Sequence, residues 1–93
     1  MSNTTTIDFG EVLDISFAAK FHSQLKDEVE INGSVRFVTT NLTRIDASCL
    51  QVLASFMSYA NENDIQIEWN EPSDVVIEAA KLTGLTQCLK LDS

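Results

Sequence analysis

Three consecutive segments constrain the fold of this 93-residue chain most, because a strand pattern, a helix pattern and a second strand pattern follow one another. Residues 35–39 are rich in β-branched and aromatic side chains, and residues 65–69 alternate between apolar and polar positions. Between them, Asp46 or Ser48 is a typical cap for a helix that continues to about Asn61. A helix that links two neighbouring strands favours parallel pairing. The sequence therefore predicts an α/β fold.

Two further helices extend this alternation. Asp14 or Ser16 caps a helix that runs to about Glu28, and Ser73 caps another that ends at Gly84. The first of these helices has an apolar residue every fourth position, at Phe17, Phe21, Leu25 and Val29.

The amino-terminal part of the chain predicts more strand. Residues 5–9 and 11–13 are strand-like and separated by Gly10, and the pair Asn32-Gly33 predicts a tight turn. The length and these elements predict one domain, residues 1–93, with about four strands.

Charge and composition exclude several classes of partner and site. The chain carries 14 acidic and 6 basic residues, a net charge of −8, which has the wrong sign for nucleic acid or an anionic membrane surface. Without a secretory start or an apolar span, we expect a cytoplasmic protein with no direct membrane insertion. Cys49 and Cys88 lack neighbours at metal-ligand spacing, so we expect two buried, inert thiols and no cofactor or metal.

The helix at 46–61 carries a polar stripe that begins at Ser48. Most of its remaining circumference is apolar, so either part of that surface faces a partner or its large residues simply fill the core. The large apolar residues in question are Phe56, Met57 and Tyr59; the stripe continues through Gln51, Ser55, Ser58 and Glu62.

Ser48 lies where free backbone N–H groups and the positive end of the helix dipole meet. A phosphate there would add about −1.5 to −2 charges and repel an acidic partner or break apolar docking. This switch requires the start of the helix to be presented to solvent, so we expect the Ser48 hydroxyl to be reachable from outside. The alternative is that Ser48 has only the local hydrogen-bonding role common for serine in a first helical turn.

Residues 42–53, Leu-Thr-Arg-Ile-Asp-Ala-Ser-Cys-Leu-Gln-Val-Leu, resemble the signature of the STAS family. Residues 13–16 resemble that family's entry into its first helix, and residues 69–85 resemble its ending. The resemblance implies a four-stranded mixed sheet flanked by three to four helices, and no catalytic activity. It also implies that Ser48 matches the phosphoacceptor of anti-sigma-factor antagonists, with Asp46 as the motif's aspartate and Asp14 beside the acceptor.

Three positions depart from the family pattern. Ala47 replaces a serine or threonine, Cys49 replaces a glycine, and Val38 stands where the family has Asp or Asn. A cysteine side chain narrows the close backbone approach that glycine permits, which weakens the match to a kinase substrate.

We therefore expect a non-enzymatic signalling module of the anti-sigma-factor antagonist or chemotaxis-associated type, which binds a kinase-like partner and is switched by phosphorylation at Ser48. The alternative is a constitutive STAS subunit bound to the ATPase of a phospholipid-transport ABC system. A homodimer is left open, and helix capping explains the carboxylates of Asp14 and Asp46 better than acid–base catalysis does. The predicted partner-binding residues are Asp14, Asp46, Ala47, Ser48, Cys49, Gln51, Val52 and Ser55.

Overall fold

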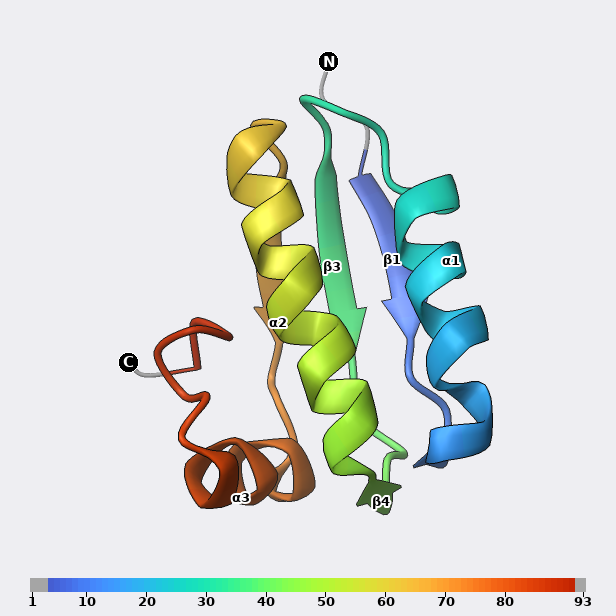
Figure 1. Ribbon diagram of the computed structural model, residues 1–93, viewed down its shortest axis with the longest axis vertical. Helices are drawn as coiled ribbons and strands as arrows, with labels where there is room; N and C mark the ends of the chain where they lie inside the picture. The colour runs from blue at the N-terminus through green and yellow to red at the C-terminus, as the bar shows by residue number, and fades with distance from the viewer. Residues whose placement is uncertain (1–3, 92–93) are drawn as a thin grey trace.

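The computed structural model describes residues 4–91, which form a parallel three-stranded sheet with helices on one face (Figure 1). The strand order is β1-β3-β5, with β1 at Thr4–Asp8, β3 at Ser34–Val38 and β5 at Gln66–Asn70. Helix α1 (Ala18–Glu28) connects β1 to β3, and α2 (Ala47–Glu62) connects β3 to β5. This confirms the strand–helix–strand unit that the sequence predicts at its centre.

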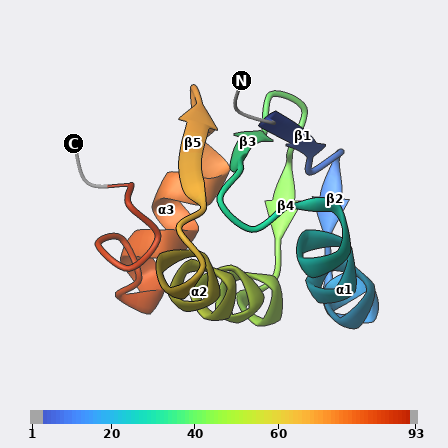
Figure 2. The same ribbon diagram turned by 90° about the horizontal axis from the view of Figure 1, so that it is seen from above.

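Both connecting helices lie on the same side of the sheet (Figure 2). Each connection moves one strand further in the same direction, so right-handed crossovers place α1 and α2 together. Helix α3 (Asp74–Thr83) lies at the carboxyl end of β5 (Figure 1).

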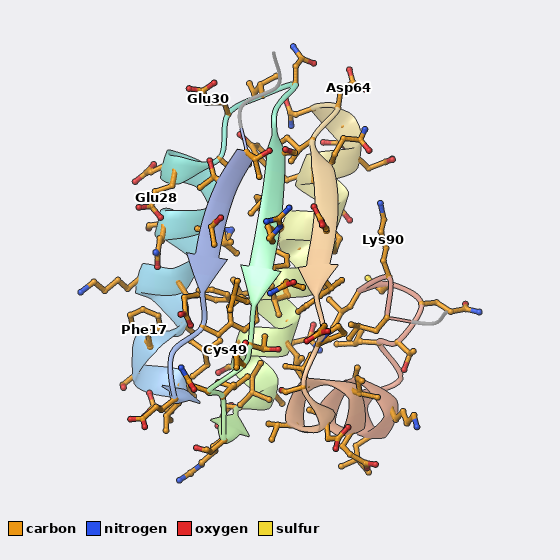
Figure 3. All side chains as sticks on the ribbon, turned by 180° about the vertical axis from the view of Figure 1, so that it is seen from behind. Phe17, Glu28, Glu30, Cys49, Asp64 and Lys90 are labelled. Carbon is orange, nitrogen blue, oxygen red and sulfur yellow. The ribbon has the colours of Figure 1, made fainter. Side chains whose placement is uncertain are left out.

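None of the helices within residues 4–91 lies on the other face of the sheet (Figure 3). Parallel sheets are usually covered on both faces, yet the strand residues on this side are mostly polar and exposed. Arg36 and Glu68 form an ion pair across β3 and β5 there, at 3.4 Å. Alternation between apolar and polar residues along each strand thus leaves a bare face suited to water.

The expectation of a single four-stranded mixed sheet is wrong, because all strand pairings among residues 4–91 are parallel and fall into sheets of three and two strands. The smaller sheet pairs β2 (Val12–Leu13) with β4 (Arg44–Ile45). Asp8 pairs with Val38, and Val12 pairs with Arg44. Between these two pairs, three residues of the first segment (9–11) lie opposite five residues of the second (39–43). The extra residues form a turn in which the Leu42 N–H donates to the Thr39 carbonyl at 3.1 Å, and this turn interrupts the ladder.

An aromatic cluster fills the space between the sheet and the helices. The Phe37 ring is fully buried, and its centroid lies 5.3 Å from that of Phe9 and 5.0 Å from that of Trp69. Phe56 and Met57 are buried in the same core. The reading in which large α2 side chains fill the core is therefore confirmed for Phe56 and Met57, whereas Tyr59 is half-buried and packs against that core.

The carboxyl-terminal segment is held to the domain by Trp69. Its indole Nε1 donates a hydrogen bond to the Leu89 carbonyl at 2.8 Å, and the Leu89 side chain is fully buried. Cys88 is exposed, which corrects the expectation of two buried thiols. Trp69 thus packs within the domain and anchors residues 85–91.

The helix ends follow the predicted signals in part. Asp14 caps a 3₁₀ turn, η1 (Ile15–Phe17), which leads into α1, and Gly84 ends α3 with a φ of 72°. Ser73 is the N-cap residue of α3, but its hydroxyl makes no cap hydrogen bond and is buried.

Candidate functional site

Two capped turns lie side by side at the carboxyl ends of β2 and β4. Leu13 pairs with Ile45, so the next residues, Asp14 and Asp46, occupy equivalent positions on the two strands. Each carboxylate accepts the backbone N–H of the serine two residues later, at 3.1 Å from Ser16 and 2.9 Å from Ser48. We call the segments Asp14–Ser16 and Asp46–Ser48 the paired turns.

Two hydrogen bonds hold the paired turns together. The Asp46 N–H donates to the Leu13 carbonyl at 2.7 Å, and the Cys49 Sγ donates to the Asp14 carbonyl at 3.4 Å. The Cys49 thiol thus contributes a contact between the turns that a glycine at this position would not offer.

The hydroxyl of Ser48 is sealed inside the domain, which corrects the expectation that it is presented to solvent. Its Oγ is buried and makes no hydrogen bond of standard geometry, although it lies close enough to the Asp46 carboxyl to help lower the pKa of that group; the residue as a whole is half-buried. Ser48 lies beside the fully buried Cys49 in a first turn that is held against residues 13–14. A phosphoryl group has no open path to this oxygen while the turn stays in place.

Hydrogen bonding keeps the Asp46 carboxyl ionised, and burial keeps the neighbouring Cys49 thiol unreactive. The backbone N–H of Ser48 lowers the pKa of the Asp46 carboxyl, because the hydrogen bond favours the carboxylate. Burial raises the pKa of the Cys49 thiol, so it stays protonated and unreactive at neutral pH. Asp46 is therefore a capping anion, and Cys49 a packing residue.

The predicted docking residues divide into three groups by exposure. Ala47, Gln51 and Ser55 are exposed, whereas Asp14, Asp46, Ser48 and Val52 are half-buried. Cys49 is fully buried, so the expectation that its side chain contributes to a docking surface is wrong. The polar stripe on α2 is at the surface throughout, at Gln51, Ser55, Ser58 and Glu62.

The sequence reasoning missed Ile15, whose side chain is 71% exposed. It occupies the middle position of the first turn, which Ala47 occupies in the second, and both are exposed apolar residues. The available signal was that Ile15 falls outside the four-residue apolar repeat that begins at Phe17. Exposed, it adds apolar area to the surface around the paired turns.

Residues 4–91 lack the features of two further kinds of site. In this range, no group of three or more His, Cys, Asp or Glu side chains is arranged to hold a metal ion. None of the helices described has both the length and the apolar character needed to cross a membrane.

Comparison of the chain with protein-family models, with curated proteins and with solved structures gave no match.

Proposed function

We propose that this chain is a STAS-type, non-enzymatic module of the anti-sigma-factor antagonist type, which binds a regulatory protein through the paired turns and the adjacent start of the α2 stripe, Gln51 and Ser55. One observation carries the proposal. The residues that resemble the STAS signature, 42–53, include the start of α2, where Ala47 and Gln51 are exposed and the equivalent position of the neighbouring turn exposes Ile15. The residues that carry the resemblance and the exposed side chains thus lie at the same end of the molecule, which supports a docking surface there.

The chemistry of this surface favours a particular kind of partner. Ile15 and Ala47 offer apolar area, Gln51 and Ser55 offer hydrogen-bonding groups, and the Asp46 carboxylate remains charged. A partner with an apolar centre and basic or N–H donor groups around it would complement this arrangement.

The buried Ser48 hydroxyl favours the second candidate, a constitutive STAS subunit bound to an ABC-type ATPase. Such a subunit docks without modification, whereas a phosphorylation switch requires the first turn of α2 to open before Ser48 can be reached. In the switched form of the proposal, opening of this turn is therefore the step that a kinase would depend on.

The experiment is a titration of the co-purifying partner with Ala47→Glu, which places a charge on the proposed surface without disturbing the core. Ser58→Glu, on the same helix but about three turns further along, is the matched control. We expect Ala47→Glu to weaken binding at least tenfold, as a charge in an interface centre does, and Ser58→Glu to change it little. Equal affinities of the two folded variants would contradict the docking surface.

Ser48→Ala separates the two candidates in the same titration. A switched module loses its response to the partner kinase in this variant, while a constitutive subunit forms the same stoichiometric complex with its ATPase before and after treatment with kinase and ATP.

A further inference from the structure

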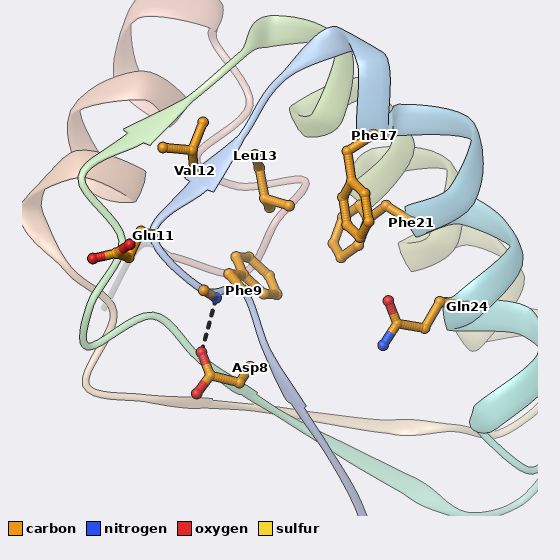
Figure 4. Close-up of a pocket in the computed structure, with 9 residues that line it drawn as sticks. Asp8, Phe9, Glu11, Val12, Leu13, Phe17, Phe21 and Gln24 are labelled. Atoms are coloured by element: carbon orange, nitrogen blue, oxygen red, sulfur yellow. Dashed lines mark hydrogen bonds between the residues drawn. The ribbon is translucent and has the colours of Figure 1, made fainter.

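A pocket of about 300 Å³ lies between α1 and the segment that links β1 to β2 (Figure 4). None of its lining residues belongs to the docking surface proposed above. Its volume is at the lower end of the range for ligand sites, which fits a small molecule. The lining residues that matter here are Asp8, Phe9, Glu11, Val12, Phe17, Phe21 and Gln24.

Three aromatic rings form the apolar part of the pocket. Phe9 meets Phe21 edge to face, with ring centroids 5.3 Å apart, and Phe17 stacks on Phe21 at 6.2 Å. Phe9 and Phe21 are buried, whereas Phe17 is half-buried. The ammonium of Lys20 lies 6.0 Å from the centroid of the Phe17 ring, so a cation of the chain already occupies one face of this ring, and the rings are left for the uncharged body of a ligand.

The polar part of the pocket is acidic. Asp8 and Glu11 are exposed carboxylates, of which Figure 4 shows Glu11 directed away from the rings, and the lining includes no basic residue. One oxygen of Asp8, Oδ1, accepts the Gly10 N–H at 2.9 Å, a bond that does not use the second carboxylate oxygen. Figure 4 shows the Gln24 amide directed toward the side on which Asp8 lies. The carboxylate oxygen of Asp8 that the Gly10 N–H leaves unused is suited to accept a hydrogen bond from an amine.

The backbone of β2 at Val12 adds further hydrogen-bonding groups to the pocket. The carbonyls of Glu11 and Leu13 accept N–H groups from the β4 side of the chain, namely those of Thr43 and Asp46. Successive residues of an extended strand direct their backbone groups to opposite sides, so those of Val12 face away from β4, on the side of the pocket.

We infer that this pocket binds a small primary amine with an aromatic body, of the size of an arylethylamine. The rings take the body, and the carboxylate side takes the protonated amine, which also benefits from the net charge of −8.

The test is an amide-resolved NMR titration of the whole chain with phenethylamine, compared with phenylacetate, which has a similar ring and the opposite charge. We expect saturable shifts at residues 8–13 and 24 with phenethylamine, and binding of phenylacetate at least tenfold weaker. Asp8→Asn keeps an oxygen for the Gly10 N–H and removes the charge, and it should weaken phenethylamine about fivefold to tenfold. Asp27→Asn, an exposed carboxylate on α1 outside the lining, is the matched control and should leave binding unchanged.

Three outcomes would overturn the inference: no saturable shift, equal binding of the two ligands, or equal effects of Asp8→Asn and Asp27→Asn. Since none of the lining residues takes part in the proposed docking surface, failure here leaves the proposed function in place, and failure of that proposal leaves this site in place.

Discussion

The two paired turns have the same local sequence pattern, Asp-x-Ser, and the same backbone cap, yet their serines differ completely. Ser16 is exposed, and its Oγ donates to Asp14 at 2.6 Å, whereas the Ser48 Oγ is buried without a partner. The first turn leads into a short 3₁₀ segment with no buried residue, and the second leads directly into the central helix. A cap motif therefore specifies the backbone, while packing beyond the motif decides what the serine can do.

Replacement of each serine by aspartate should give the largest difference in stability between the two turns. Ser48→Asp places an unpaired charge in a sealed position and should lower the free energy of unfolding by about 3 kcal/mol or more. Ser16→Asp stays at the surface, and its cost should remain below about 1 kcal/mol. Urea unfolding of the two variants measures the difference, and a small, equal cost for both would show that Ser48 is open in solution.

Thiol labelling measures how often the second turn opens. Cys88 is exposed and should react rapidly, whereas Cys49, fully buried beside Ser48, should react on the order of a hundredfold or more slowly. Single-cysteine variants, Cys49→Ala and Cys88→Ala, assign the two rates to the two thiols. Similar rates would mean that the first turn of α2 opens readily and that the switched form of the proposed function regains support.

Removal of the Ser48 hydroxyl and removal of the Ser16 hydroxyl should change the stability of the fold in opposite directions. Ser48→Ala eliminates a buried hydroxyl without a partner and should raise the free energy of unfolding by about 1 kcal/mol. Ser16→Ala removes a hydrogen bond to Asp14 and should lower it by about 0.5 kcal/mol. Denaturant midpoints give both signs; destabilisation by Ser48→Ala would indicate that this hydroxyl has a bonding partner in solution.

The smallest expected effect concerns the stability of the fold at acidic pH. The folded-state pKa of Asp46 lies below its unfolded value, so its contribution to stability is present above the unfolded pKa. That contribution falls as the pH drops from the unfolded pKa, near 3.9, through the lowered folded pKa. Asp46→Asn should therefore flatten part of the loss of stability below about pH 5, which thermal melts at successively lower pH can follow. A wild-type-like acid profile for Asp46→Asn would contradict the lowered pKa.

The helices and strands follow from signals of short range. Capping by Asp14, Asp46 and Gly84 and the apolar repeat of α1 depend on residues a few positions apart. The sheet arrangement does not, because the turn at Thr39–Leu42 interrupts a ladder between strands some 30 residues apart. That is why α/β character was predicted correctly, whereas the single mixed sheet was not.

The sequence by itself determined that a helix begins near Asp46 or Ser48 and that a polar stripe runs along it, since both depend on local hydrogen bonding and on periodicity. Only the tertiary structure decided that the Ser48 hydroxyl is sealed and that Ile15 is exposed. Exposure of a side chain depends on neighbours that are distant in sequence, such as the Cys49 thiol bound to the Asp14 carbonyl, and no local pattern records them.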